Sequence, residues 1–440
     1  MSESRQPYIQ ARFLDNANYA LSRVYVPQLH LLVEFDGQLD ATRLKKALRL
    51  TMVAEPVLGC RFVPRCITPH WAGSPRETAT SPPLLREKAA DEQTLQRCLD
   101  RFLREPVLAL QGPQLKALLL RSKEGDRLIV KLNHQVVDAG GAKDFGYLLA
   151  SLYRRSDGHP DHVPPANSGT RSLRQVYGRF PKTRLLKILC RFFMEFVHNM
   201  IPYKSITYPS GMAEVGDYTF AFKRFSRERV TALKAYGKKM SATVNDLMVT
   251  ALLRAYVRQC KWNGNGALRM VGTVDLRRYV PNGRAKALCN LSSFYFLHLG
   301  HHLGNGFDDT LRRVKNRMDV LKAADLGLSF ALGNYLFLLP YPFVLKAFIS
   351  SNTFSRLAKT GNMPPSMTNL GPIDDKALDF GSPGVTGAEI WPPPCYPPLL
   401  VPGLSGFRDT LTLSVGFFES AIEKKNLEEL FDMVDQELPC

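Results

Sequence analysis

Several features that would narrow the function of a protein are absent from this 440-residue sequence. Its eight cysteines include no Cys-x-x-Cys pair, and none stands beside a histidine at metal-ligand spacing. The sequence therefore lacks the pattern of a zinc site or of a dense disulfide framework. The N-terminus is polar and has no apolar core of a secretory signal. We expect free thiols, no bound metal and a cytoplasmic location.

Long uninterrupted hydrophobic runs are also missing. Residues 326–349 form the most apolar stretch, but two prolines and a lysine interrupt it, which argues against a straight membrane span. Residues 185–197 mix basic with bulky apolar side chains. Both stretches are typical of buried helices. The alternatives are a contact with a membrane surface and the wall of an apolar channel.

Acidic residues are few relative to basic ones. The sequence has 40 Asp and Glu against 58 Lys and Arg, and its formal net charge is +18. A nucleic acid, an anionic membrane surface and a polyphosphorylated molecule such as a coenzyme A thioester would each suit this charge. No Lys/Arg-rich run with interleaved aromatic residues occurs, which argues against nucleic acid. A peripheral location at a membrane stays among the alternatives.

Length and composition predict a globular protein of two domains, since 45% of the residues are hydrophobic and 22% are charged. We predict an N-terminal domain over residues 1–165 and a C-terminal domain over residues 211–440. A crossover linker is expected over residues 166–210, because the chain becomes rich in Pro, Gly and Ser between residues 155 and 181.

Hydrophobic patterns in the first domain indicate an α/β fold. Residues 28–35 have the composition of a strand, and Asp40 is placed to cap the helix that follows. Residues 115–120 and 127–132 are apolar runs separated by a polar, glycine-containing turn, which predicts a hairpin.

The second domain repeats this alternation. Thr243 and Asp246 form a capping-box pattern before an amphipathic helix. The proline-dense segment 381–402 is expected to be a loop or an edge strand. Strands are predicted at residues 218–225, 268–275, 292–299 and 411–418.

The most informative segment is the octapeptide NHQVVDAG at residues 133–140, which Gly141 follows. It lies where a predicted strand ends and a helix begins, a position that can present the imidazole of His134 to a channel. A neutral imidazole is a suitable general base for acyl transfer. Two roles are open for Asp138. It orients the imidazole, or it turns away and pairs with an arginine. We favour the second role, with Arg277 as the partner.

Gly140 and Gly141 have two interpretations as well. They fit a close backbone approach by a pantetheine arm, and they equally fit the start of a helix. Acyl transfer also needs donors for the tetrahedral oxyanion, which Ser, Thr or Asn side chains near the pocket can supply.

On these residues the sequence resembles the superfamily of coenzyme A-dependent acyltransferases. This group includes chloramphenicol acetyltransferase, nonribosomal peptide condensation domains, alcohol acetyltransferases and wax ester synthases. The segment 134–141 resembles its HxxxD catalytic motif, and Val274–Arg277 resembles the segment whose arginine pairs with the motif aspartate. Further resemblances lie at residues 242–249, 290–293 and 366–371.

The resemblance implies two chloramphenicol acetyltransferase-like sandwich domains that form a pseudo-dimer with an interfacial channel. It implies that His134 is the general base, that Asp138 is structural and that Arg277 is its partner. The channel or substrate-contacting candidates are Asn133, Gly140, Gly141, Asn245, Asp246, Asn290, Ser292, Thr368 and Asn369. No cofactor is expected to stay bound, and acyl-CoA would be the co-substrate for an alcohol or lipid acceptor.

Other functions stay open at this point. Condensation domains have a second histidine where this sequence has Asn133, which makes peptide-bond condensation less expected. The donor can still be an acyl carrier protein instead of acyl-CoA. A non-catalytic scaffold of the same fold is a third interpretation, although both motif residues are present, and a membrane-surface lipid carrier is a fourth.

Overall fold

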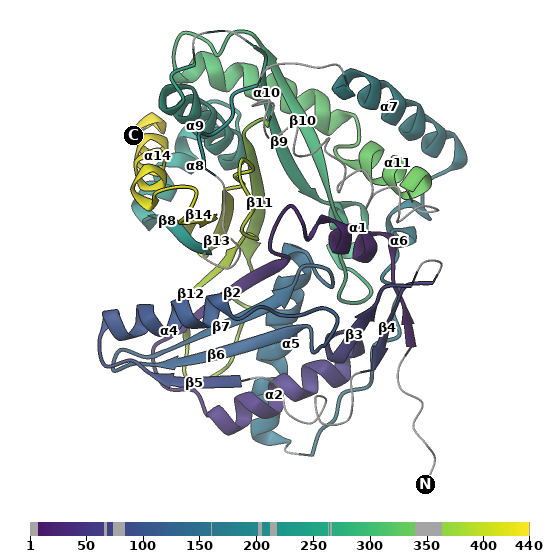
Figure 1. Ribbon diagram of the computed structural model, residues 1–440, viewed down its shortest axis with the longest axis vertical. Helices are drawn as coiled ribbons and strands as arrows, with labels where there is room; N and C mark the ends of the chain where they lie inside the picture. The colour runs from purple at the N-terminus through teal and green to yellow at the C-terminus, as the bar shows by residue number, and fades with distance from the viewer. Residues whose placement is uncertain are drawn as a thin grey trace.

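The computed structural model describes residues 8–65, 68–73, 84–159, 161–200, 205–211, 218–262, 264, 266–338 and 363–439. These residues form two α/β halves, one below and one above in Figure 1, each built around a large mixed sheet. The N-terminal half lies below and the greater part of the C-terminal half lies above, so the contact between them runs across the middle of the molecule.

A five-stranded sheet with the order β12-β2-β7-β6-β5 forms the lower half. Its strands are β2 (Gln28–Phe35), β5 (Leu84–Lys88), β6 (Leu115–Arg121), β7 (Asp126–Asn133) and β12 (Val385–Trp391). Helices α2 (Ala41–Ala54) and α5 (Ala139–Gly158) pack against one face, and α4 (Glu92–Arg104) packs against the other. Because both faces are covered, most side chains of β2 and β7 are buried.

Smaller elements lie at the edge of the lower half and at its junction with the upper half, where α1 is drawn (Figure 1). A three-stranded sheet, β1-β4-β3, lies beside the helix α1. These elements are β1 (Tyr8–Gln10), α1 (Phe13–Leu21), the 3-10 helix η1 (Pro56–Gly59), β3 (Cys60–Val63) and β4 (His70–Gly73).

A six-stranded sheet with the order β10-β9-β11-β13-β14-β8 forms the upper half. Its strands are β8 (Tyr218–Phe225), β9 (Leu268–Asp275), β10 (Ser292–Gly300), β11 (Ser366–Ile373), β13 (Gly403–Phe407) and β14 (Thr410–Phe418). Its helices are α8 (Arg227–Lys239), α9 (Val244–Gln259), α10 (Phe307–Ala323), α11 (Leu328–Leu338) and α14 (Lys424–Glu437), with 3-10 helices η2 (Leu276–Tyr279) and η3 (Pro281–Gly283).

Strand β12 ties the two halves together. It comes late in the chain, yet it pairs antiparallel with β2, with Ala388 opposite Val33 and Ile390 opposite Leu31. The proline-dense segment 381–402 therefore supplies an edge strand of the lower sheet, as the sequence allowed. The lower sheet therefore contains strands from both the N-terminal and the C-terminal parts of the chain.

The local predictions for the strands are confirmed. β2, β8 and β9 have the predicted bounds, and β10 and β14 are each one residue longer. The carboxylate of Asp40 accepts hydrogen bonds from the backbone of Thr42 and Arg43 and so caps α2. Strands β6 and β7 form the predicted antiparallel hairpin.

The described part of residues 166–210 contains two helices, α6 (Arg174–Tyr177) and α7 (Lys182–Met200). The interpretation of residues 185–197 as a buried helix holds only for one side of α7. Ile188 and Phe192 are buried, but the helix lies at the surface and exposes other large apolar side chains. Of the apolar stretch 326–349, the part beyond Leu338 lies outside the described residues. Within the described parts of the chain, no helix combines the length and the apolar character that a membrane span requires.

Candidate active site

His134 stands in the short turn between β7 and α5, at the junction of the two halves. Its backbone is held from both sides, because its N–H donates to the carbonyl of Pro27 at 2.8 Å and its carbonyl accepts from Asn18 Nδ2 at 3.0 Å. The hydroxyl of Tyr25 donates to Asn18 Oδ1 at 2.8 Å, and the ring centroids of Tyr25 and His134 are 5.8 Å apart. The histidine is therefore fixed on a rigid frame.

The protonation state of His134 follows from its contacts. Its Nδ1 lies 2.9 Å from the carbonyl oxygen of Val137, which can only accept, so a neutral ring carries its proton on Nδ1. The lone pair of Nε2 is then available. Burial lowers the pKa of His134, although the nearby charge of Asp138 opposes this shift. The ring is only half-buried, and it has the tautomer and charge that a general base requires.

The carboxylate of Asp138 turns away from His134 and binds residues of the upper half. Arg277 Nη1 lies 2.8 Å and 3.0 Å from its two oxygens. The backbone N–H groups of Gly141 and Leu291 also donate to it, at 2.8 Å and 2.6 Å. Since Val137 binds the imidazole Nδ1, Asp138 is not the group that orients the ring. It anchors the turn that bears His134.

Arg277 is the centre of a buried charge cluster. Its side chain is 6% exposed, and it also lies 3.2 Å from Asp275 and 3.5 Å from Asp144 while donating to the carbonyl of Cys289 at 2.9 Å. Burial by itself would lower the pKa of Arg277. The negative charges of Asp138 and Asp275 have a larger, opposite effect, so the pKa of Arg277 is raised. The guanidinium therefore stays charged and joins α5 to the segment between η2 and β10.

Gly140 and Gly141 allow this close packing. A Cβ at position 140 would overlap the guanidinium of Arg277 and lie 2.8 Å from Asp275 Oδ2. A Cβ at position 141 would lie 2.9 Å from Val137 Cβ and 3.0 Å from the carbonyl of Cys289. Both glycines are buried, so the close approach that they permit is to the protein itself. The space beside them is filled and does not line an open channel.

Replacing Gly140 with alanine should destabilise the protein by about 1–3 kcal/mol, because the new methyl group displaces Arg277. Helix propensity alone predicts the opposite sign, since alanine is favoured over glycine by about 1 kcal/mol in a helix. Gly158 is a matched control in the same helix, because a Cβ added there would meet nothing within 4 Å. Urea unfolding should show that Gly158→Ala is neutral or stabilising, and equal effects of the two changes would contradict this account.

Asn133 and Asn290 occupy different environments. Asn133 is buried within the protein, where it donates to Gln114 Oε1 at 2.7 Å and accepts from the backbone of Gln135 at 2.9 Å. It supports the turn from inside and does not face a channel. Asn290 donates to the carbonyl of Gln135 at 2.9 Å and is close enough to His134 to influence its pKa. Its buried Oδ1 has no hydrogen-bond partner among the described residues.

A second group of candidate residues gathers where α9, β9 and β11 meet. Asn369 donates to Asn245 at 2.9 Å, and the hydroxyls of Thr368 and Thr273 are 2.6 Å apart. Thr273 and Asp275 are two residues apart on β9, so they lie on the same face of the sheet. The second group and the cluster around Arg277 therefore adjoin the same face of β9.

The other two candidates from the sequence have structural positions. Asp246 accepts from the backbone of Thr243 at 2.9 Å and caps α9, and Lys322 lies 3.7 Å from it. Ser292 begins β10 and stands opposite Asp275 in the ladder with β9. It is half-buried, two residues after Asn290.

Sequence patterns missed a second anchor of the His134 turn. Arg171 donates to the carbonyls of Val136 and Leu288, at 3.0 Å and 2.8 Å, and binds both carboxylate oxygens of Asp15, at 2.7 Å and 3.0 Å. Both charged side chains are almost fully buried. Neither residue belongs to a recognisable motif, because the pair is formed between α1 and a segment predicted to be linker. The turn is therefore held by Arg277 on one side and Arg171 on the other.

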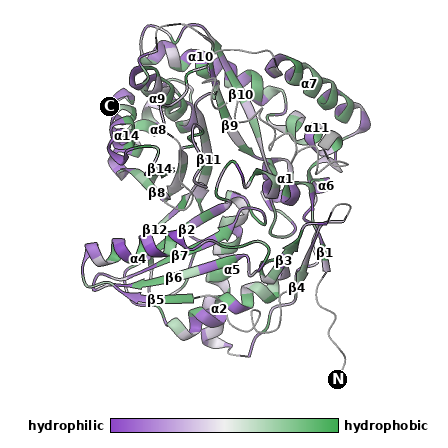
Figure 2. Ribbon diagram, viewed as in Figure 1, coloured by the Kyte–Doolittle hydropathy of each residue, from purple (hydrophilic) through white to green (hydrophobic). Residues whose placement is uncertain are grey.

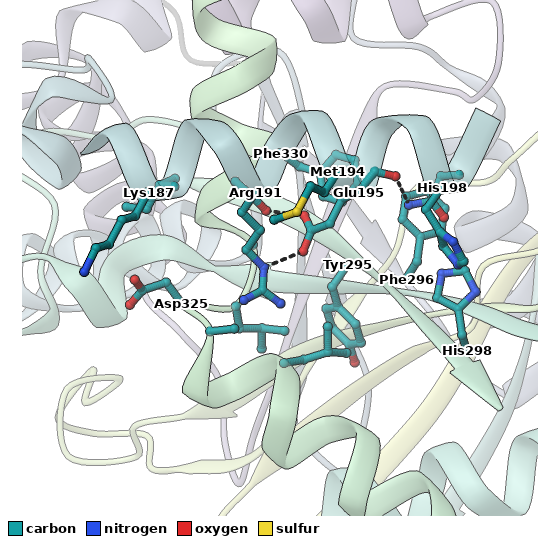
Figure 3. Close-up of a pocket in the computed structure, with 17 residues that line it drawn as sticks. Lys187, Arg191, Met194, Glu195, His198, Tyr295, Phe296, His298, Asp325 and Phe330 are labelled. Carbon is teal, nitrogen blue, oxygen red and sulfur yellow. Dashed lines mark hydrogen bonds and ion pairs between the residues drawn. The ribbon is translucent and has the colours of Figure 1, made fainter. Parts of the chain in front are cut away.

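A cavity of about 770 Å³ lies between α7 and β10, separate from the residues that touch His134 (Figure 3). Its apolar walls include Ile188, Leu326 and Phe330, and its cationic residues include Lys187 and Arg191. One side of the cavity is formed by the segment 324–327, and the carbonyl of Gly327 accepts from the hydroxyl of Ser293 at 2.8 Å. No cluster of three His, Cys, Asp or Glu side chains suited to a metal ion was found in the described parts of the chain.

Neither a family model nor a curated protein sequence matches this chain. Solved structures do match over the full length. The first condensation domain of the CDA synthetase is 18% identical with a TM-score of 0.70, and the match covers 100% of this chain and 98% of that chain. The trichothecene 15-O-acetyltransferase TRI3 from Fusarium sporotrichioides is 12% identical with a TM-score of 0.71, covering 100% and 97%.

A third match is polyketide synthase associated protein 5 from Mycobacterium tuberculosis, which is 13% identical with a TM-score of 0.66 and 98% of each chain covered. This chain therefore has the two-lobed α/β fold of condensation domains and of an O-acetyltransferase. The predicted fold, with its two chloramphenicol acetyltransferase-like halves, is confirmed at the level of architecture.

Proposed function

We propose that this protein is an O-acyltransferase that moves an acyl group from acyl-CoA to an alcohol. The observation that carries the proposal is the state of His134. Val137 fixes its Nδ1, burial favours the neutral ring, and Nε2 is left with an available lone pair. A base of this kind, at the junction of two lobes with an acyltransferase-like fold, suits the removal of a proton from a hydroxyl group.

In the proposed reaction, His134 Nε2 takes the hydroxyl proton as the oxygen attacks the thioester carbonyl, and a carbon–oxygen bond forms. The tetrahedral intermediate then collapses and the carbon–sulfur bond breaks. The imidazolium returns its proton to the departing thiolate, so the products are an ester and a free thiol. Asp138, Arg277 and Arg171 position the turn and do not touch the reacting atoms. Asn290 and Ser292 are the proposed donors to the oxyanion.

The proposed donor and acceptor rest on charge and on space. A net charge of +18 suits the phosphates of coenzyme A. The cavity between α7 and β10 is separate from His134, and its apolar walls suit the distal part of a long lipophilic acceptor or acyl chain, away from the reacting end. An alternative donor is an acyl group bound to a carrier protein, which the shared fold with a condensation domain favours. An alternative function is that of a non-catalytic scaffold. We also propose a cytoplasmic location, peripheral to a membrane.

The test is release of free thiol from a panel of acyl-CoAs in the presence and absence of short- and long-chain alcohols. Acyl groups bound to a phosphopantetheinylated carrier protein are assayed in parallel. We expect thiol release that requires both acyl-CoA and an alcohol, with an ester as the second product. Release from the carrier-bound donor alone would replace the proposed donor. No release from either donor with any acceptor would favour the scaffold interpretation.

A further inference from the structure

Helix α7 packs on the protein through the buried side chains of Ile188 and Phe192. Its polar side chains border this buried face. Lys187, Arg191, Glu195 and His198 follow one another at helical spacing and line the cavity above β10 (Figure 3). Arg191 binds Glu195 at 2.7 Å within this cavity. A surface helix of a globular protein normally directs its polar face to solvent. In α7 the polar side chains gather along the cavity, beside the buried face, and a different set of side chains covers the outer side of the helix.

The outer face of α7 is apolar. Leu186, Cys190, Phe193 and Val197 recur at intervals of three and four residues and form a single stripe, called here the outer stripe. Leu186 is 62% exposed, Phe193 46% and Val197 63%. Phe196, which is 46% exposed, lies beside the stripe. The stripe runs for about 16 Å along the helix. Figure 2 shows α7 at the periphery of the upper half, where its ribbon alternates between apolar and polar colours.

Positive charge lies at the N-terminal end of the outer stripe. The side chains of Arg179, Lys182 and Lys187 are exposed at and before the first turns of α7. The helix contains four Lys or Arg and a single acidic residue, Glu195, which is already bound to Arg191. An apolar stripe flanked by basic side chains is the pattern of a helix that lies in the plane of a membrane surface. The apolar groups enter the acyl region and the cations meet lipid phosphates.

A second copy of this chain is a less suitable occupant of the outer stripe. Two molecules of net charge +18 would bring like-charged surfaces together around the stripe, which disfavours self-association. An anionic lipid surface complements the same charge.

We propose that the outer stripe of α7 docks the protein on the surface of a membrane that contains anionic phospholipids. The helix lies flat in the interface and does not cross the bilayer. This inference does not depend on the chemistry proposed for His134, because it rests on a different element and a different property.

The experiment is co-flotation with vesicles of phosphatidylcholine alone and of phosphatidylcholine with about a third phosphatidylglycerol. The full-length protein should float with the anionic vesicles, and added salt should weaken this binding. The double change Leu186→Glu with Val197→Glu should reduce binding by about tenfold or more, since two apolar side chains no longer enter the lipid. Lys182→Glu with Lys187→Glu should remove the preference for anionic vesicles.

Leu108→Glu with Leu110→Glu is the matched control, because these two side chains are 47% and 48% exposed but lie far from α7 in sequence, in the loop before β6. The control should bind as the unchanged protein does, and all variants should keep its Tm. Unaltered flotation of the α7 variant, or no flotation of the unchanged protein with anionic vesicles, would overturn the proposal. So would a dimer in solution that the α7 changes dissociate. Thiol release from soluble short-chain substrates separates this outcome from a failure of the proposed function.

Discussion

Replacing His134 with alanine should lower kcat/KM for acyl transfer by about 10²–10⁴, the usual contribution of a positioned general base. Binding of the donor should change little, because no other group that contacts the substrates is altered. The fold should survive, since the ring is half-buried and its hydrogen bond to Val137 is worth about 0.5–1.5 kcal/mol. The measurement is thiol release at several acyl-CoA concentrations, with Tm as the check on folding.

The pH dependence gives this prediction a second readout. Burial lowers the pKa of His134, so the neutral base persists below about pH 6.5, the ordinary value for histidine. The acid limb of the rate should therefore lie below pH 6.5 and should be absent from the residual rate of the His134→Ala variant. Between the lowered pKa and 6.5 the folded state binds fewer protons than the unfolded state, so the contribution of His134 to stability falls as the pH falls through this window.

His159→Ala is the matched control, because His159 is an exposed histidine at the end of the same helix. Its rate and acid limb should equal those of the unchanged protein. A His134→Ala variant with an unaltered rate would show that the proposed mechanism is wrong. Equal losses in both variants would point to a general effect on α5.

Replacing Arg277 with alanine should destabilise the protein by about 3–5 kcal/mol. The change leaves the buried carboxylate of Asp138 without its cation, although the N–H groups of Gly141 and Leu291 still donate to it. It also leaves the carbonyl of Cys289 without one donor. The turn that bears His134 should loosen, so acyl transfer should fall even at temperatures where the protein stays folded. Urea unfolding measures the first effect and thiol release the second.

An exposed ion pair provides the control for Arg277. Arg227 lies 2.9 Å from Asp409, but its side chain is 73% exposed. Solvent screens such a pair, and Arg227→Ala should change stability by about 0–1 kcal/mol. The double variant Arg277→Met with Asp138→Asn should be less destabilised than Arg277→Ala, because the unpaired buried charge is removed as well. Losses of equal size from Arg277→Ala and Arg227→Ala would mean that the cluster does not hold the turn.

The sequence allowed the strands and caps to be predicted because their causes are local. Alternating or continuous apolar residues specify β2 and β9, and a single carboxylate next to free backbone N–H groups specifies the start of α2. The position of His134 at a strand end followed from the same local patterns. The partner of Asp138 lies 139 positions away, so the sequence could only offer Arg277 as the favoured candidate, which the resemblance to a family then supported.

By itself, then, the sequence determined an α/β fold, the turn that presents His134, and an excess of positive charge, since each depends on neighbouring residues or on composition. Only the tertiary structure decided which atoms surround that turn. It joined Asp15 to Arg171 across 156 positions, filled the space beside Gly140, and returned β12 to pair with β2. It also decided that α7 turns Ile188 and Phe192 to the core and leaves the outer stripe exposed. The physical reason is that long-range contacts depend on how the elements pack in space, and apolar periodicity along a helix is the same whichever way the helix is turned.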